Sequence, residues 1–231
     1  MRQKIKVLKT AFPHTIPVMT GYMFLGIAFG ILLTSKDYHF VWALVMSLFI
    51  YAGSMQFVAV EILTSIFNPL NAFFITLMVN ARHLFYGLSM LLKFRGTGKY
   101  KPYLIFGLTD ETYSLLCSSE IPDDVDKNLF MFYTTLLNQT YWVVASVTGA
   151  LLGSLFTFNT KGIDFVLTAL FVVIFINQWK SQKNHTPALI GLAGSVLCLL
   201  LFGPDNFIIP SMILIIAALT IFKKSIEKGV E

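Results

Sequence analysis

Eight long apolar segments dominate this chain of 231 residues and decide what it can fold into. A helix needs roughly 20 mostly apolar residues to cross the hydrocarbon core of a bilayer. Charged residues make up 13% of the chain, whereas a soluble domain usually carries about 25%. The pattern predicts an all-α, polytopic membrane helix bundle with about seven to eight spans, some of them broken or re-entrant, in a single domain over residues 1–231. The segments lie at roughly 13–34, 40–64, 70–92, 103–119, 129–156, 163–179, 187–203 and 207–222.

The net charge of +5 comes from basic residues in short clusters that flank the apolar segments. Lysine and arginine gather in this way on the cytoplasmic side of membrane proteins. The clusters are therefore topology signals, and no nucleic-acid partner is expected. They comprise Arg2, Lys4, Lys6 and Lys9, then Lys93, Arg95, Lys99 and Lys101, and finally Lys223, Lys224 and Lys228.

Eight crossings with the N-terminus inside would place Lys180, Lys183 and the C-terminal cluster inside as well. The same count places the cluster at 93–101 outside, against the charge bias. Either the bias yields locally or one early segment is re-entrant. Segment 103–119 is the weakest span, because it is short and carries two carboxylates.

Polar residues inside the apolar segments are the functional candidates. An ionised side chain at the bilayer centre costs about 2.5–3.5 kcal/mol on insertion scales, so such residues must pair, become neutral or line a wet cavity. No metal-binding pattern occurs among them. The candidates are Glu61, Asn80, Arg82, His83, Asp110, Glu111 and Asn138.

Arg82 is the sharpest candidate, because about ten residues of apolar segment lie on either side of it and its guanidinium stays protonated. It needs an anion, which Asp110, Glu111, Glu61 or a substrate carboxylate can supply. The pair either fixes helix register or forms part of a substrate or coupling site. Three carboxylates share one arginine, so a surplus carboxylate can carry a proton. His83 can assist, although a hydrogen-bonded core histidine is the more ordinary interpretation.

Gly53 and Gln56 lie in the stretch Tyr51-Ala-Gly-Ser-Met-Gln56, inside the second apolar segment. Gly53 can let the helix unwind and expose its ends to a substrate at mid-membrane, or it can simply allow close packing. Asn138 shares a helix face with Trp142, which is four residues further along. Hydrogen bonding between helices and pore lining both remain open for Asn138.

Three motifs resemble those of the AzlC family, the larger subunits of branched-chain amino acid exporters. They are Tyr51-Ala-Gly-Ser-Met-Gln-Phe57, Asn80-Ala-Arg-His-Leu-Phe-Tyr-Gly87 and Thr109-Asp-Glu-Thr-Tyr113. The resemblance runs along essentially the whole chain. It implies a multi-pass transporter domain in the bacterial cytoplasmic (inner) membrane and a small AzlD-type membrane subunit as partner. It also implies export of leucine, isoleucine, valine and often methionine, driven by the proton gradient, without a cofactor.

The resulting hypothesis is alternating access by a proton-coupled exporter. Arg82, or a half-helix N-terminus near Gly53, would bind the substrate carboxylate. Asp110, Glu111 or Glu61 would bind the ammonium group or carry the proton. Gln56, Asn80 and Asn138 would supply neutral hydrogen bonds. The alternatives are a passive channel or other permease, a non-transporting subunit and, less favoured because no HExxH or GxSxG motif occurs, a membrane-embedded enzyme.

Overall fold

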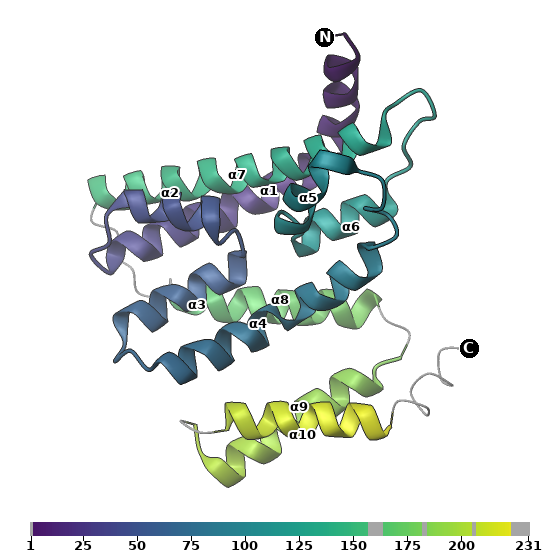
Figure 1. The fold of residues 1–231 in the computed structure, drawn as a ribbon. Helices are drawn as coiled ribbons and strands as arrows, with labels where there is room; N and C mark the ends of the chain where they lie inside the picture. The colour runs from purple at the N-terminus through teal and green to yellow at the C-terminus, as the bar shows by residue number, and fades with distance from the viewer. Residues whose placement is uncertain (1, 157–163, 182–183, 205–206, 223–231) are drawn as a thin grey trace. The chain divides into compact units, whose positions relative to one another are not determined.

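The computed structural model describes residues 2–156, 164–181, 184–204 and 207–222, and every regular element in these ranges is helical (Figure 1). The predicted helical class is confirmed. The elements are α1 (Arg2–Ser35), α2 (Phe40–Phe49), α3 (Gly53–Thr64), α4 (Pro69–Met90), the short 3₁₀ helix η1 (Gly98–Tyr100), α5 (Lys101–Phe106), α6 (Asp110–Ser118), α7 (Lys127–Leu155), α8 (Asp164–Ser181), α9 (Thr186–Phe202) and α10 (Ile208–Ile221).

Six of the eight predicted segments form single helices, and the segments at 40–64 and 103–119 are each broken in two. Helix α1 begins earlier than the apolar segment, so Pro13 and Pro17 lie inside the helix. Of the described helices, only Gln3–Ser35 meets both the length and the hydropathy expected of a membrane span. The number of crossings therefore stays a prediction.

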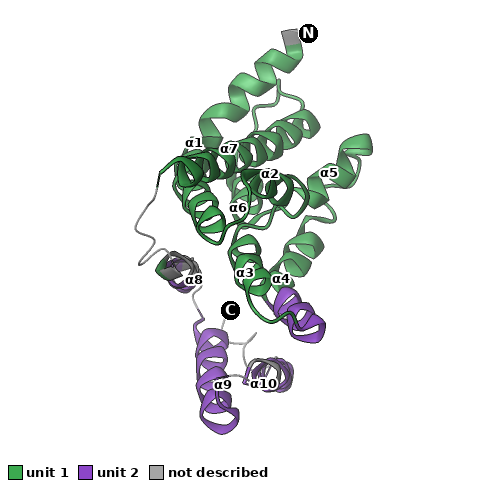
Figure 2. Cartoon of the chain, turned by 90° about the vertical axis from the view of Figure 1, so that its left-hand side faces the viewer, with its two compact units in different colours: residues 1–67, 79–167 green, residues 68–78, 168–231 purple. Residues whose placement is uncertain are grey.

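The chain forms two compact units (Figure 2), and the single domain expected over 1–231 stays a prediction. The first unit comprises residues 1–67 and 79–167, and the second comprises residues 68–78 and 168–231. In the second unit α9 packs on α10, where a Cβ on Gly194 would lie 2.8 Å from Leu214 Cδ2. All the candidate residues belong to the first unit.

Helices α1 and α7 form the frame of the first unit and run parallel to each other (Figure 1). Thr15 Oγ1 lies 3.0 Å from the hydroxyl of Tyr141. Further along both helices, a Cβ on Gly26 would lie 2.6 Å from Ala145 Cβ, and one on Gly149 would collide with the backbone of Ile27. Glycine allows two helix backbones to approach this closely. The spacings Gly26-x-x-x-Gly30 in α1 and Gly149-x-x-x-Gly153 in α7 therefore serve this contact.

Helices α2 and α3 fold back on each other as a helical hairpin. The hydroxyl of Tyr38, just before α2, donates to the carbonyl of Leu63 near the end of α3 at 3.2 Å. Closer to the tip, Gln56 Nε2 donates to Ser47 Oγ at 3.1 Å. In a continuous helix those two residues would be about 13 Å apart. The second apolar segment thus folds back on itself, and its two ends lie close together.

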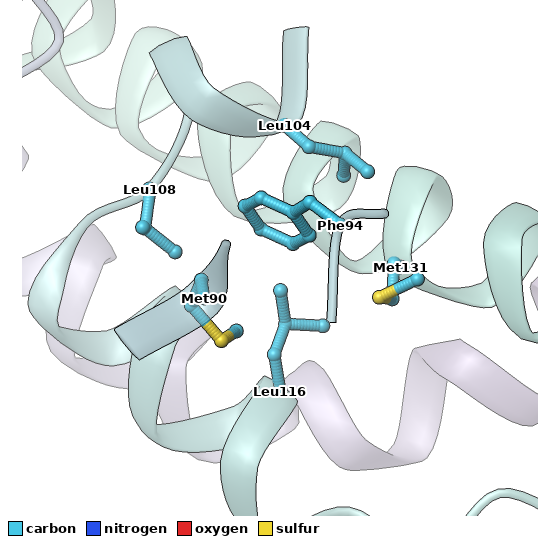
Figure 3. Close-up of a cluster of buried hydrophobic side chains, with 6 residues drawn as sticks. All are labelled: Met90, Phe94, Leu104, Leu108, Leu116 and Met131. Carbon is cyan, nitrogen blue, oxygen red and sulfur yellow. The ribbon is translucent and has the colours of Figure 1, made fainter. Parts of the chain in front are cut away.

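Helices α5 and α6 form a second hairpin, whose base lies at the C-terminal end of α4. Lys93 Nζ donates to the carbonyl of Leu116 near the end of α6. Leu104 of α5 and Leu116 of α6 share a buried cluster with side chains from the end of α4 and from α7 (Figure 3). The complete cluster is Met90, Phe94, Leu104, Leu108, Leu116 and Met131. Helix α4, which links the two hairpins in the chain, has 22 residues, or about 33 Å of helix.

Candidate functional site

The tip of the first hairpin is the break between α2 and α3, at Ile50, Tyr51 and Ala52. Tyr51 has a φ of +43°, a left-handed conformation that costs a non-glycine residue of order 1–3 kcal/mol and is typical of functional sites. The first amide groups of α3, as in any helix, lack intrahelical acceptors. No side chain caps them. Gly53 is the first residue of α3, and a Cβ there would lie 3.2 Å from the Trp142 ring. The predicted unwinding thus occurs just before Gly53, whose lack of a side chain makes room for the indole.

The tip of the second hairpin is the break between α5 and α6, at Gly107, Leu108 and Thr109. A Cβ on Gly107 would collide with the methyl group of Thr135. Thr109 caps α6, because its side-chain oxygen accepts from the amide of Thr112 at 3.3 Å. Helix α6 therefore begins with two acidic residues in its first turn, where the helix dipole favours negative charge.

Arg82 on α4 joins the two tips. Its Nη1 lies 2.6 Å from Asp110 Oδ2 on α6, and its Nη2 donates to Ser54 Oγ on α3 at 2.7 Å. Among the anions that sequence analysis left open, the structure therefore pairs Arg82 with Asp110. Arg82 Nε and Asp110 Oδ1 are buried without a hydrogen-bond partner.

Glu111 belongs to a second polar cluster, which faces α1 and α7. The Tyr22 hydroxyl donates to Glu111 Oε2 at 2.7 Å and lies 2.8 Å from Thr109 Oγ1. Asn138 Nδ2 donates to Thr112 Oγ1 at 3.0 Å, and Thr112 is in turn within 3.0 Å of Thr109. Asn138 is fully buried, yet its Oδ1 has no partner. Helices α1, α6 and α7 thus contribute to one hydrogen-bonded cluster around a single carboxylate.

Gln56 uses its amide group within the protein. Its Oε1 accepts from Trp142 Nε1 at 2.8 Å, and its Nε2 binds Ser47. Gln139 makes an equivalent link, donating to the carbonyl of Leu48 at 3.2 Å and accepting from Tyr103 at 2.6 Å. Both glutamines attach the hairpins to α7.

Glu61 lies apart from these clusters. It is exposed on α3, two helical turns beyond Gly53, and in the described part of the chain its carboxylate has no hydrogen bond or ion pair. Because Glu61 is a charged residue in an apolar segment, sequence analysis predicted a buried role for it. Since α3 is one arm of a hairpin, residues near its end can lie outside the packed core.

A pocket of about 350 Å³ opens between the two hairpin tips and α4, a volume near the lower end of the range typical of ligand sites, about 300–1,000 Å³. Asn80 and His83 line it, as do Tyr51 and Leu108 from the two breaks. Asn80 Oδ1 is buried and unpartnered, and the carbonyl of Asn80 lies 3.3 Å from His83 Nδ1. The remaining lining residues are Ile50, Ala52, Leu84, Gly87, Ile105 and Phe106.

Sequence analysis missed two tyrosines at this site. Tyr51 and Tyr22 are both buried at 3% and 5% exposure, and the Tyr51 hydroxyl has no partner. Tyr51 opens a motif already singled out, so its proximity to Gly53 was a usable signal. Tyr22 lies in an apolar segment rich in aromatic residues, and nothing in its neighbourhood distinguishes it.

Comparison with known proteins supports the resemblance seen in the motifs. The AzlC protein family model matches residues 17–156. The branched-chain amino acid transport protein AzlC of Bacillus subtilis (strain 168) is 54% identical over 221 residues, which cover 96% of this chain and 87% of that protein.

More distant relatives are also described as membrane proteins. An uncharacterized membrane protein of Helicobacter pylori (strain J99) is 44% identical over 98% of this chain and 100% of its own length. The inner membrane protein YgaZ of Escherichia coli (strain K12) is 26% identical over 79% of each chain. No solved structure matches the chain. Because the family match covers more than half of its length, the chain belongs to the AzlC family and is a membrane transport protein, not an enzyme.

Proposed function

We propose that this protein is the larger subunit of a secondary transporter that exports branched-chain amino acids in exchange for protons, together with a small AzlD-type membrane subunit. The observation that carries the proposal is the meeting of two helix breaks at the Arg82–Asp110 pair, beside a pocket with a mostly apolar lining. Interrupted helices that meet at mid-membrane form the substrate sites of many secondary transporters. The name of the Bacillus subtilis relative supplies the substrate class.

The proposed topology has six crossings and two re-entrant hairpins in the cytoplasmic membrane. Helices α1, α4, α7, α8, α9 and α10 cross, while α2–α3 and α5–α6 enter from opposite sides and return. With the N-terminus inside, the cluster Lys93–Lys101 then falls inside, as the charge bias requires. Lys180 and Lys183 also fall inside. This arrangement supports the re-entrant alternative raised by the charge pattern.

The pocket suits the aliphatic side chain of the substrate. Ile50, Leu84, Ile105, Phe106 and Leu108 give it apolar walls. The substrate carboxylate binds at the uncapped N-terminus of α3 beside Gly53, where the helix dipole favours negative charge. Arg82 adds positive charge there, although Asp110 neutralises part of the charge of Arg82. Asn80 and His83 supply polar contacts at the wall of the pocket. Since one methylene in such a site is worth about 1–3 kcal/mol, leucine, isoleucine, valine and methionine should all be accepted.

The test is leucine efflux from cells loaded with a leucine-containing dipeptide, with this chain and its small partner expressed singly and together. Efflux should require both chains and collapse with a protonophore. Efflux that ignores the pH gradient would indicate a passive channel instead, and absence of efflux would reject the substrate.

A pair of glycine variants tests the pocket itself. Gly87 lines the pocket, and a Cβ there would meet no atom within 4 Å. Gly87→Leu should therefore reduce leucine efflux more than valine efflux, because the added side chain takes up pocket volume. Gly21→Leu is the matched control, since Gly21 is exposed on α1 with equally free space. Equal effects of the two substitutions would place the substrate elsewhere.

A further inference from the structure

Asp110 and Glu111 are consecutive residues with opposite surroundings. Asp110 has a guanidinium nitrogen at 2.6 Å. Glu111 receives the hydroxyl of Tyr22, and in the described part of the chain no lysine or arginine lies within ion-pair distance of its carboxylate. An ionised carboxylate held in a membrane without a cation is costly. Glu111 must therefore be neutralised by a proton or by a cation that is not fixed in the protein, whereas Asp110 already has a permanent partner.

One unpartnered buried atom belongs to the cluster of Glu111, and another belongs to the tip of the first hairpin. Asn138 Oδ1 in the cluster and the Tyr51 hydroxyl at the tip are both buried and have no hydrogen-bond partner. A primary ammonium group has three N–H donors. A carboxylate, an amide carbonyl and a phenol oxygen are three acceptors that match it. Native proteins rarely leave such buried atoms unpaired without a functional reason.

Glu111 is also connected to the pocket. Leu108 lines it and directly precedes Thr109, whose hydroxyl lies 2.8 Å from the Tyr22 hydroxyl that donates to Glu111. Glu111 itself keeps part of its surface accessible, unlike the buried Tyr22, Thr109 and Thr112 around it. An amino acid with its side chain in the pocket can thus present its ammonium group to Glu111.

We propose that Glu111 is a shared site, which the substrate ammonium group and the coupling proton occupy in turn. This proposal rests on the proposed function and specifies its mechanism. A proton adds to the carboxylate and leaves it neutral, so the ammonium group loses its counter-ion and departs. A substrate ammonium that enters from the cytoplasm displaces the proton and stays protonated itself. Because the two occupants exclude each other, inward proton movement is coupled to outward substrate movement.

The other titratable groups near Glu111 have different roles. Asp110 is held by Arg82, and the phenols of Tyr22, Tyr51 and Tyr86 keep their protons, because phenols are neutral near pH 7. His83 on α4 and Tyr51 line the pocket, Tyr103 on α5 donates to Gln139, and α7 contributes the neutral Asn138, which donates to Thr112. Glu111 is the carboxylate in this group without a fixed cation.

The experiment measures proton release on leucine binding to the purified two-chain complex in weakly buffered detergent solution across a range of pH. The wild-type complex should release up to roughly one proton per leucine on the acidic side of the range, because ligand and proton compete for one group. 4-Methylpentanoate, which has the leucine side chain and carboxylate but no ammonium group, should release none. Leucine binding to the wild type without proton release would overturn the proposal whatever the variants do.

The variants assign the proton to one residue. Glu111→Gln should abolish proton release and weaken leucine binding roughly ten-fold to a hundred-fold, the usual range for a lost charged hydrogen bond, while binding of 4-methylpentanoate persists. Glu111→Asp should restore proton release, and Glu120→Gln, in an exposed loop, should leave it unchanged. Proton release that persists in Glu111→Gln, or that is lost in Glu61→Gln, would overturn the assignment of the proton to Glu111. Neither result would contradict the proposed export of leucine. A wild-type complex that neither binds nor moves leucine would overturn both proposals.

Discussion

The Arg82–Asp110 pair makes the sharpest stability prediction, because the structure gives both its partners and its exposure. Removing one member of a buried ion pair typically costs about 3–5 kcal/mol, since the other charge is left uncompensated. The two side chains keep 21% and 26% of their surface exposed, which places the expected cost near 3 kcal/mol. Arg82→Gln also loses the bond to Ser54, worth about 1 kcal/mol. We therefore expect Arg82→Gln to lose about 3–4 kcal/mol and Asp110→Asn about 3 kcal/mol.

The double variant should be far less damaged than the sum of the two. Gln at 82 and Asn at 110 are neutral and can hydrogen-bond to each other, so a loss of about 1–2 kcal/mol is expected. The coupling between the sites would then be about 4–6 kcal/mol, above the range of about 0.5–3 kcal/mol usual for residues in contact. A coupling of about 2 kcal/mol or more would still identify a real pair.

The assay is reversible unfolding of the purified protein in mixed micelles with increasing denaturing detergent, analysed as a double-mutant cycle. The exposed pair of Lys6 and Asp124 provides the control cycle, because exposed ion pairs contribute little. Additive effects of Arg82→Gln and Asp110→Asn would refute the argument, since they would show that the two charges do not compensate each other in the folded protein.

Three further predictions concern other parts of the first unit. Gly149→Ala should lower the melting temperature in detergent, because a Cβ would collide with the α1 backbone. Gly21→Ala should leave the melting temperature unchanged or slightly higher. Equal effects of the two substitutions would contradict the close contact of α1 and α7. Gln56→Leu should cost about 1–3 kcal/mol of unfolding free energy, since it leaves the indole N–H of α7 unpaired, and an unaltered value would show that this hydrogen bond is absent. The Lys6 ammonium holds the pKa of Asp124 below its ordinary value. The small stabilising effect of this ion pair is therefore present above about pH 4 and is lost as the pH falls through the lowered pKa. NMR titration of Asp124 should find a higher midpoint in Lys6→Gln than in the wild type, and an equal midpoint would exclude the pair.

Hydropathy predicted where the helices lie, but not that two of the apolar segments fold back on themselves. The segment at 40–64 has the length of a membrane span, yet α2 and α3 fold back so that Tyr38 reaches Leu63. Apolar content shows where a segment can be buried, but not whether it crosses or returns. The charge pattern agrees with this fold-back, since Lys93–Lys101 fits the inside only when an early segment does not cross, and the number of crossings stays a prediction.

The candidate site was predictable where charge was involved. Arg82 had to have an anion, and Asp110 was among the choices. The choice between Asp110 and Glu111 was not predictable, because it depends on which side of α6 each residue faces and on the position of Tyr22, nearly ninety residues earlier. Gln56 shows the same limit, since its partner Trp142 belongs to another helix.

The long separation between Gln56 and Trp142 has a consequence for biosynthesis. The two residues are 86 positions apart, so at about 5–20 residues per second the ribosome reaches Trp142 roughly 4–17 s after Gln56. During this time the tip of the first hairpin lacks Arg82 at first, and Trp142 for longer still. Its open amide and hydroxyl groups must then be solvated by water or held by the insertion machinery. We expect the hairpin to reach its final position only after α7 has emerged, so that α2 and α3, although made early, are among the last parts of this unit to settle.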